Sequence, residues 1–362
     1  MISKLKFKNF KCFEELDMDL KKVNIFTGIN GMGKSTVIQS LLLLKQSEPR
    51  FVSQNGLSLN GEYIELGNSQ DVVYDKAEEG EVGIYFVTTD GRLVGNTFLF
   101  EQDSDFLPCA SKEKCDMKLT DKGFVYISAY RIKPQERYGV INEQDLKERK
   151  FGNNGEFALQ YLSVYGDCDI TNPCAIEKSE KGNSLMNQTR IWMDRVSPGV
   201  APQVKVMMDT RSSELKFDFI EGKERTNSYT SINVGFGITY VLPVVVALLS
   251  AKTGDIVIIE NPEAHIHPAG QRMLGELIAR VGAGGVQIFV ETHSEHVVNG
   301  VRIAVKNEQI KKEDVEVAFF YKDDTDGYKH VYKSLQINDN GKMSSWPKGF
   351  FDEWEKAMIE LL

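Results

Sequence analysis

The sequence predicts an α/β fold with parallel strands at its centre. Three short runs rich in β-branched and other apolar residues support this prediction: residues 23–27, 256–259 and 286–290. The second run is four consecutive β-branched residues, which is the pattern of a parallel strand covered on both faces. The first run is soon followed by an apolar stretch at 37–44, which is typical of a buried helix.

A complete phosphate-binding loop lies between the first strand and this helix. From Gly28 to Thr36 it has the sequence Gly-Ile-Asn-Gly-Met-Gly-Lys-Ser-Thr, with the full G-x4-G-K-S spacing. Glycines allow backbone N–H groups to surround phosphates, and the helix N-terminus adds the positive end of its dipole. Lys34 reaches the outer phosphates, and the Ser35 hydroxyl can bind Mg²⁺. The predicted nucleotide-binding residues of the loop are Gly28, Asn30, Gly31, Gly33, Lys34, Ser35 and Thr36.

Acidic residues follow the second predicted strand. The strand at 255–259 is followed by Glu260-Asn261-Pro262-Glu263, and the strand at 286–290 by Glu291-Thr292-His293-Ser294. A nucleotide hydrolase needs an acid that orders Mg²⁺ and a base that activates water. We therefore expect the 255–259 strand to lie beside the 23–27 strand, with its carboxylates at the same sheet edge.

A glycine-rich segment begins another predicted helix. This segment is Asn233-Val234-Gly235-Phe236-Gly237, and the exposed N–H groups of such a helix start suit a phosphate. A helix start without any ligand is the alternative interpretation.

The rest of the chain predicts inserted elements. Residues 1–22 alternate polar and apolar side chains, as edge strands do, and Asp90-Gly91 predicts a hairpin. Helical patterns extend over 143–197, with Gly152–Glu156 as a cap, and 204–208 and 215–219 predict strands. The expected division is 1–55 for N-terminal strands and phosphate loop, 56–130 for an antiparallel β lobe, 131–200 for a helical insertion, 201–310 for the second half of the site, and 311–362 for a C-terminal hairpin and cap.

Taken in this order, the motifs resemble the head of an ABC-type ATPase, and more narrowly the SMC, RecF and OLD (overcoming lysogenization defect) group. Residues 5–13 (L-K-F-K-N-F-K-C-F) are similar to that group's L-x-I-x-N-F-K-S-F, and residues 30–35 to its N-G-x-G-K-S. Residues 260–268 (E-N-P-E-A-H-I-H-P) are similar to its D-E-P-E-x-x-L-H-P. The resemblance covers about 1–50 and 230–300, and covers the middle poorly.

The tail at 346–352 (W-P-K-G-F-F-D) further resembles a subgroup of short standalone bacterial ATPases that share the E-N-P-E-A-H motif. The resemblance implies an ABC-type P-loop head with an inserted antiparallel β and helical lobe. No long heptad array is present in the sequence, so no long coiled coil is expected. In the subgroup, functions are mostly inferred, often as partners in phage defence.

The resemblance also implies a homodimer. In such heads ATP and Mg²⁺ lie between two subunits, and one copy of each half per chain gives two equal sites in a two-fold dimer. Ser35 and Glu260 would hold Mg²⁺, and His293 would contact the γ-phosphate. Asn233, Gly235 and Gly237 would bind the nucleotide held by the partner subunit. ATP would then join the subunits, and its hydrolysis would release them.

Two positions depart from the group's pattern. Glu260 stands where the group usually has the Mg²⁺-ordering Asp, and Asn261 stands where it usually has the catalytic Glu. Asn261 can orient water but cannot accept a proton. Glu263 is the nearest other carboxylate and is the predicted base. Either Glu263 has taken over this role, or hydrolysis is slow and the protein is an ATP-gated switch.

Composition limits the classes of function. The formal net charge of −9 argues against a protein that coats nucleic acid nonspecifically. The longest apolar run, 241–249, is well short of the roughly 20 residues that span a bilayer, so no membrane segment is expected. The N-terminus lacks the pattern of a signal peptide, and the odd number of cysteines favours reduced thiols, which together predict a cytoplasmic protein.

Three smaller features have alternative interpretations. His265 and His267 could form a metal pair, but the resemblance places them on a loop that faces the partner subunit. Asp323–Gly327 resembles a nuclease motif of OLD enzymes, but too few residues follow for that domain, so a hairpin turn and no intrinsic nuclease are expected. Arg131 could place a cation near the nucleotide or a partner, or lie in a surface loop.

The sequence therefore predicts a Mg²⁺-dependent ATPase that gates a separate effector protein, with a role in bacterial phage defence. The first alternative is a nucleotide sensor with little intrinsic hydrolysis. The second is a DNA-binding ATPase of the repair type. The nucleotide-binding subunit of a transporter is disfavoured, because the glycine-rich segment differs from L-S-G-G-Q and no glutamine loop is identified.

Overall fold

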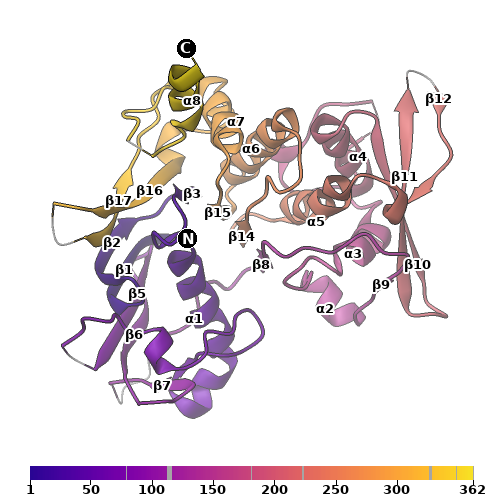
Figure 1. The fold of residues 1–362 in the computed structure, drawn as a ribbon. Helices are drawn as coiled ribbons and strands as arrows, with labels where there is room; N and C mark the ends of the chain where they lie inside the picture. Colours follow the sequence, from indigo (N-terminus) through magenta and orange to yellow (C-terminus); the bar gives the residue numbers. More distant parts are fainter. Residues whose placement is uncertain are drawn as a thin grey trace. The chain divides into compact units, whose positions relative to one another are not determined.

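The computed structural model describes residues 1–78, 80–111, 116–180, 182–221, 224–325, 328–347 and 349–361. The chain forms two compact units. Unit 1 contains residues 1–121, 316–336 and 345–362, and unit 2 contains residues 122–315 and 337–344. The predicted mixed α/β fold is confirmed, and its elements are labelled in Figure 1. The longest helix of the described residues has 21 residues, so these residues form no long coiled coil.

Unit 1 contains a four-stranded antiparallel sheet in the order β2-β1-β5-β6. Its strands are β1 (Ile2–Phe10), β2 (Phe13–Asp19), β5 (Glu81–Thr88) and β6 (Leu93–Leu99). The alternation in β1 reflects one buried face, since Leu5 and Phe7 are buried while Lys6 and Lys8 are exposed. Of the two N-terminal strands, β2 lies at an edge of the sheet and β1 does not, because β1 pairs with β2 on one side and with β5 on the other. The β5–β6 pair confirms the hairpin at Asp90-Gly91.

A second group of strands in unit 1 carries the phosphate loop. Strand β3 (Val23–Gly28) neighbours β16 (Val315–Asp323), which pairs antiparallel with β17 (Lys329–Ser334). The β16–β17 pair confirms the hairpin predicted near residue 325, of which residues 326 and 327 lie outside the described residues. Unit 1 also contains α1 (Lys34–Gln54), β4 (Gly56–Ser58), its partner β7 (Phe106–Pro108), a short 3-10 helix (Ser69–Asp71) and α8 (Glu353–Leu361).

Unit 2 contains three parallel strands in the order β15-β14-β8. They are β8 (Phe124–Ile127), β14 (Ile256–Glu260) and β15 (Gln287–Glu291). The first four residues of β14 are buried, which explains their unbroken apolar pattern. Strand β14 pairs with β15 on one side and with β8 on the other. The expectation that the acidic strand lies directly beside the phosphate-loop strand is therefore wrong, because both of its edges are already paired.

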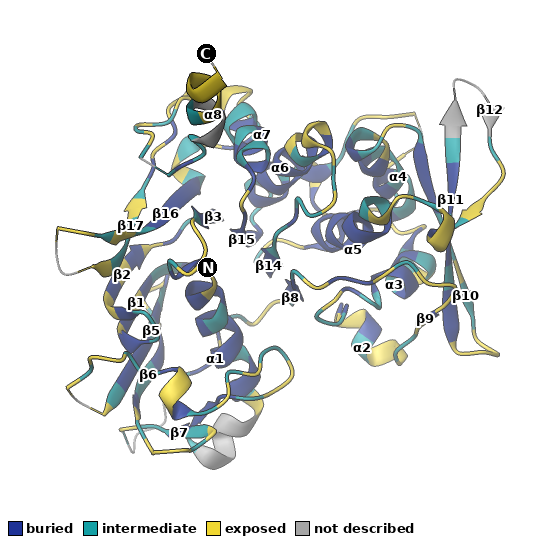
Figure 2. Ribbon diagram, in the orientation of Figure 1, coloured by how far each residue is buried: buried dark blue, intermediate teal, exposed yellow. Residues whose placement is uncertain are grey.

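Unit 2 contains the helices α5 (Phe236–Ser250), α6 (Pro268–Ala283) and α7 (Glu295–Lys306). Helices α6 and α7 lie side by side (Figure 1), and a Cβ on Gly275 would lie 3.1 Å from the Cα of Gly300. Helix α5 is buried from Thr239 onward (Figure 2), so the apolar run at 241–249 is a core helix. Among the described residues, no helix has the length and hydrophobicity needed to cross a membrane.

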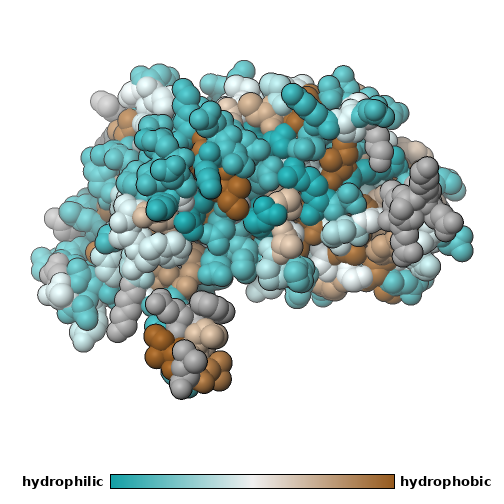
Figure 3. Space-filling view, turned by 90° about the horizontal axis from the view of Figure 1, so that it is seen from above, coloured by the Kyte–Doolittle hydropathy of each residue, from teal (hydrophilic) through white to brown (hydrophobic). Residues whose placement is uncertain are grey.

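The helical insertion and a β hairpin complete unit 2. The helices are α2 (Glu143–Lys147), α3 (Ala158–Tyr165) and α4 (Leu185–Val196), and the hairpin strands are β10 (Val200–Met207) and β11 (Ser212–Glu221). Short strands β9 (Tyr138–Gly139), β12 (Glu224–Arg225) and β13 (Tyr229–Thr230) pair with β11. These elements confirm the helical stretch and the two strands that the sequence predicts. The surface in Figure 3 is largely hydrophilic, in keeping with a mean hydropathy of −0.29.

Two local expectations differ from the structure. Strand β8, expected in the antiparallel lobe at 56–130, pairs in parallel with β14. The segment Gly152–Glu156 does not cap a helix, because α3 begins at Ala158 with Phe157 as its N-cap. Instead, the backbone carbonyls of Asn153 and Asn154 accept hydrogen bonds from the N–H groups of Ser128 and Ile132. This segment therefore supports the chain that leaves β8.

Candidate nucleotide-binding site

Three glycines with left-handed backbone give the phosphate loop its shape. The φ angles are +135° at Gly28, +75° at Gly31 and +105° at Gly33. Residues with a Cβ adopt these conformations only at a cost. The loop leads from β3 directly into the first turn of α1, where backbone N–H groups lack partners within the helix. The sequence motif thus folds into a backbone cradle that suits an anion.

Two of the three glycines are also required by their neighbours. A Cβ on Gly28 would lie 2.3 Å from the backbone oxygen of Phe320 on β16. A Cβ on Gly33 would lie 2.4 Å from the ring of Phe13. At Gly31, a Cβ would meet nothing within 4 Å. The loop is therefore packed tightly against unit 1 at both ends and open at its centre, where a phosphate could approach the backbone.

The other predicted residues of the loop differ in exposure. Lys34 is buried, and its ammonium donates hydrogen bonds to the carbonyls of Gly28 (2.8 Å) and Ile29 (2.9 Å). Thr36 is buried as well, with its hydroxyl 3.7 Å from the sulfur of Cys12. Asn30 and Ser35 are exposed. The Ser35 side chain can therefore reach a cation from solvent, whereas Thr36 faces the protein.

Two distant parts of unit 1 contact this loop, and the sequence predicts neither contact. His330 of β17 lies beside it, and burial lowers the pKa of this imidazole, opposed by a hydrogen bond with the backbone of Met32. In the tail, a Cβ on Gly349 would lie 3.6 Å from Cδ1 of Ile29. Phe350 is buried against Phe319 of β16, with ring centroids 5.5 Å apart. The tail motif therefore folds onto β16 beside the start of the phosphate loop.

Glu260 ends β14 and is held from the β8 side. Its carboxylate accepts hydrogen bonds from the Tyr126 hydroxyl (3.1 Å) and the Ala129 N–H (3.1 Å). Burial raises the pKa of Glu260, and these two donors oppose the shift. A half-buried carboxylate with both oxygens oriented in this way suits a divalent cation, since hard cations prefer carboxylate oxygens.

Glu263 connects the ends of β14 and β15. Its two carboxylate oxygens accept hydrogen bonds from the Thr292 hydroxyl (2.7 Å) and the His293 N–H (2.8 Å). Burial raises the pKa of Glu263, with the same two donors opposing the rise. His293 itself is exposed. The structure thus brings two predicted residues, Glu263 and His293, together, and it shows that Glu263 orients the turn that presents His293.

Asn261 and Arg131 form a buried junction at the end of β14. Asn261 has a left-handed backbone (φ +42°), and its N–H donates to the carbonyl of Glu291 (2.8 Å). The Arg131 guanidinium is buried and donates to the backbone carbonyls of Glu260 and Asn261. Its cation also lies over the Tyr240 ring at 5.2 Å. Arg131 is therefore not in a surface loop, and it fixes the backbone that carries Glu260 and Asn261.

The glycine-rich helix start has one open and one packed glycine. Gly235 is the N-cap of α5, and a Cβ there would meet nothing within 4 Å. A Cβ on Gly237 would lie 2.0 Å from the backbone oxygen of His265. Packing within the chain is thus sufficient to require glycine at 237. Asn233 is exposed and donates to the Thr230 hydroxyl (3.0 Å).

The two histidines after β14 have separate roles in the described structure. The His265 ring lies edge-on to Phe236 and Tyr240, with centroids 4.9 and 5.2 Å away. His267 is the N-cap of α6, where its Nδ1 accepts from the Ala269 N–H (3.3 Å). No group of three or more potential metal ligands is found among the described residues. The structure gives no support to the metal-pair alternative.

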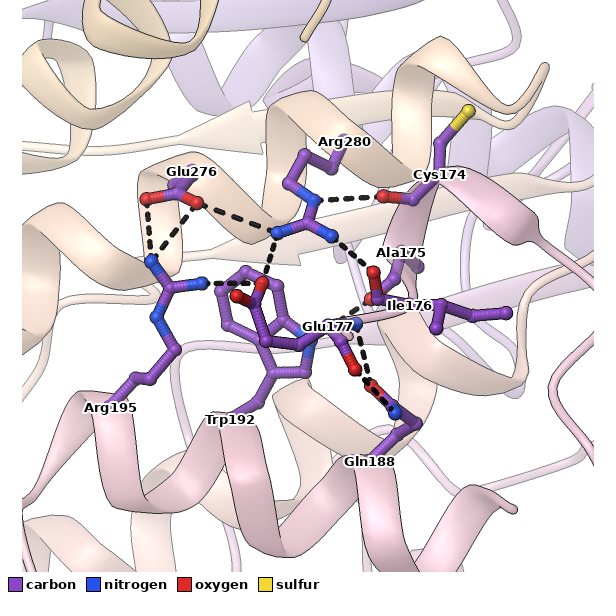
Figure 4. A network of polar contacts seen from close by, with 9 residues as sticks. All are labelled: Cys174, Ala175, Ile176, Glu177, Gln188, Trp192, Arg195, Glu276 and Arg280. Carbon is purple, nitrogen blue, oxygen red and sulfur yellow. Dashed lines mark hydrogen bonds and ion pairs between the residues drawn. The ribbon is translucent and has the colours of Figure 1, made fainter. Parts of the chain in front are cut away.

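An ion-pair network anchors α6 to α4 (Figure 4). Arg195 of α4 pairs with Glu276 of α6 at 3.0 Å and with Glu177 at 2.8 Å, and Arg280 of α6 pairs with the same Glu177 at 2.5 Å. Both guanidinium groups lie over the Trp192 ring, with the Cζ of Arg195 4.6 Å and that of Arg280 5.0 Å from the ring centroid. This network fixes the helix that begins directly after the His265–His267 loop, which connects the helical insertion to the candidate site.

Family comparisons agree with an ATPase. Residues 1–151, which contain the phosphate loop, match the family described as "AAA ATPase domain". Residues 180–299, which contain the glycine-rich helix start and the acidic strand, match "AAA domain, putative AbiEii toxin, Type IV TA system". Residues 310–361 match "Protein of unknown function (DUF3696)". Together, these matches support an ATPase of the P-loop class. No curated protein matches the chain.

Among solved structures, the chain is similar to several SMC heads. A crystal structure of the Smc head bound to the C-winged helix domain of ScpA shares 14% identity at a TM-score of 0.48, over 93% of this chain and 98% of that one. The SMC head domain from Thermotoga maritima shares 10% identity at a TM-score of 0.43, over 93% of this chain and 99% of that one. The third structure is an Smc head domain with an extended coiled coil, bound to the C-terminal domain of ScpA derived from Pyrococcus furiosus. It shares 14% identity at a TM-score of 0.47, over 99% of this chain and 98% of that one.

Proposed function

We propose that the protein is a Mg²⁺-dependent ATPase whose two copies associate on ATP and thereby control a separate effector protein. The observation that carries this proposal is the phosphate loop. Its three glycines have left-handed backbone, Lys34 lies along it, and it leads into the N-terminus of α1. The two ATPase family matches support the proposal, because they contain the loop and the acidic strand.

In this proposal each residue of the loop has a defined task. Backbone N–H groups around Gly31, where a Cβ would meet nothing, hold the phosphates, and Lys34 moves from the loop carbonyls to the outer phosphates. Ser35 and Glu260 would hold Mg²⁺, which would supply positive charge to the phosphate oxygens. His293, exposed at the end of β15, contacts the γ-phosphate.

Glu263 and Asn261 share the activation of water in this proposal. Burial raises the pKa of Glu263, so its carboxylate is a stronger base than an exposed one. Asn261 Oδ1 is buried and accepts no hydrogen bond among the described residues. A buried acceptor without a partner is costly, and a water molecule at this position would satisfy it. Asn261 therefore orients the water, and Glu263 accepts its proton.

A nucleotide switch with little hydrolysis is the second candidate. The observation that favours it is that both oxygens of Glu263 already accept hydrogen bonds from the Thr292–His293 turn. In that case Glu263 is a positioning residue, and binding of ATP alone changes the association of the subunits. A DNA-binding ATPase of the repair type is a third candidate, and the net charge of −9 gives it no support.

We further propose a role in bacterial phage defence, exercised in the cytoplasm through a separate effector, with which the match to "AAA domain, putative AbiEii toxin, Type IV TA system" is consistent. In a dimer, the glycine-rich segment would bind the nucleotide held by the other copy, through Asn233, Gly235 and Gly237. Gly235 is the best placed of these, since a Cβ there would meet nothing within 4 Å.

Solution mass tests the proposal. Light scattering would be measured with and without Mg²⁺ and ATP for the wild type, Lys34→Ala and Glu263→Gln. We expect the wild type to gain a dimer with ATP, Lys34→Ala to stay unchanged, and Glu263→Gln to hold the dimer longest. A mass that does not respond to ATP in any variant would refute association on ATP. Binding to duplex DNA that weakens steeply with salt would favour the repair-type alternative.

A further inference from the structure

Unit 2 contains a cavity of about 290 Å³ that takes no part in the proposed nucleotide site. It is lined by the end of α2, one face of α3, the chain that follows α3, and the C-terminal end of α5. Its chemically distinctive side chains are those of Lys147, Tyr161, Tyr165, Cys168, Asp169 and Lys252. Leu185 and Leu249 add apolar surface.

Two tyrosines provide an aromatic wall. Tyr161 and Tyr165 lie one helical turn apart on α3, with ring centroids 4.7 Å apart. Phe151 supports Tyr161 from the other side, at 5.1 Å. Burial raises the pKa of Tyr161, so its hydroxyl is a neutral donor. Neither tyrosine hydroxyl has a hydrogen-bond partner among the described residues, so both can bind a ligand in the cavity.

The charged groups of the cavity are predominantly positive. Lys147 and Lys252 supply two ammonium groups, against the single carboxylate of Asp169. Lys147 also forms an exposed ion pair with Glu143. The backbone N–H of Lys252 donates to the Asp255 carboxylate (2.6 Å), but its ammonium, exposed at the cavity rim, forms no ion pair within 4 Å among the described residues. A cation without a partner beside an aromatic wall is complementary to an anion attached to a planar ring.

We propose that this cavity binds a small aromatic anion, with its ring against Tyr161 and Tyr165 and its anionic group at Lys252. The volume lies near the lower end of the range for ligand sites, about 300 to 1,000 Å³, and fits one ring with a phosphate or carboxylate group. The cavity also contains a reporter, because the exposed Cys168 thiol lines it. A bound ligand covers this thiol.

Protection of Cys168 from alkylation tests the proposal. The rate of its modification by iodoacetamide would be followed by peptide mass spectrometry, with phenyl phosphate as the probe. The Lys34→Ala background removes the contribution of the phosphate loop. We expect phenyl phosphate at millimolar concentration to slow the modification severalfold, whereas inorganic phosphate and phenol, each tested alone, have little effect. Lys252→Gln should raise the half-protecting concentration about tenfold, since a charge-assisted contact is lost.

Lys311→Gln is the matched control, because it removes another exposed lysine of unit 2 outside the cavity. It should leave the protection unchanged, and Tyr161→Phe should weaken it less than Lys252→Gln. Circular dichroism of each variant verifies that it is folded. The proposal is overturned if phenyl phosphate does not protect Cys168, or if inorganic phosphate protects it equally well. Equal effects of Lys252→Gln and Lys311→Gln would also overturn it.

Discussion

The phosphate loop and the carboxyl ends of β14 and β15 reach defined geometries by different means. The loop is determined by its backbone, through glycines whose Cβ atoms would clash with Phe320 and Phe13. The ends of β14 and β15 are determined by side chains, because Arg131, Thr292 and Tyr126 hold buried carbonyl and carboxylate groups. We infer that the loop is sensitive to added volume, whereas the strand ends are sensitive to lost donors and to pH.

The largest effect is expected from added volume at the loop. Gly28→Ala places a Cβ 2.3 Å from a backbone oxygen at a φ of +135°, so it should lower the free energy of unfolding by about 3 kcal/mol or more. Urea unfolding measures this loss. Gly31→Ala is the matched control, since it adds the same atom without a clash and should cost only about 1 kcal/mol for its φ of +75°. Equal losses would show that conformation, and not packing, determines the loop.

Loss of the buried guanidinium should be next in size. Arg131→Met leaves the carbonyls of Glu260 and Asn261 without their donor, and should lower the free energy of unfolding by about 2 to 3 kcal/mol. It should also reduce ATP turnover, because the backbone that carries both residues is released. Lys133→Met, an exposed cation nearby, should change either quantity little. If both variants behave alike, Arg131 does not organise the strand end.

Glu263 should make stability depend on pH. Burial raises the pKa of Glu263, so the folded chain binds more protons than the unfolded chain above the unfolded value of about 4.3. Its contribution is complete below that value and is lost as pH rises through the folded pKa. Each unit of separation between the two pKa values corresponds to about 1.4 kcal/mol. The melting temperature of Glu263→Gln should therefore improve relative to the wild type between pH 4.5 and 7. A constant difference would contradict the assigned shift.

His330 should give the smallest effect, with the opposite sign. Burial lowers the pKa of His330, so its contribution to stability is present above the unfolded value of about 6.5 and is lost as pH falls through the folded pKa. His330→Gln should therefore lose less stability than the wild type between pH 7.5 and 5.5, by a few tenths of a kcal/mol because the site is partly exposed. Thermal unfolding of both proteins at pH 7.5 and at pH 5.5 measures this difference. An unchanged pH dependence in His330→Gln would show that this histidine does not affect stability.

The contrast between the two regions also explains which features could be predicted from the sequence alone. Spacing and glycines predicted the loop from Gly28 to Thr36, because its geometry depends on the backbone. Apolar runs predicted β14 and β15. Their neighbours could not be predicted, because pairing of β14 with β8 depends on strands distant in sequence.

The hydrogen-bond partners of the site residues could not be predicted from the sequence either. Glu263 was predicted as the nearest carboxylate, but its contacts with Thr292 and His293 depend on how β14 and β15 align. Arg131 and His330 each lie about a hundred residues or more from their contacts at Glu260 and Met32, and no local pattern connects them. For Arg131, the sequence offered one signal, which is an apolar, strand-like run from residue 126 that ends in this charged residue.

Steady-state ATP hydrolysis with Mg²⁺ tests the central claim most directly. Phosphate release would be measured for the wild type and for Lys34→Ala, with Lys45→Ala of the same helix as the control. We predict turnover by the wild type and by Lys45→Ala, and a loss of about a hundredfold or more in Lys34→Ala, which lacks the cation at the outer phosphates. A wild type that binds ATP but releases phosphate no faster than Lys34→Ala would contradict the claim that this site hydrolyses ATP.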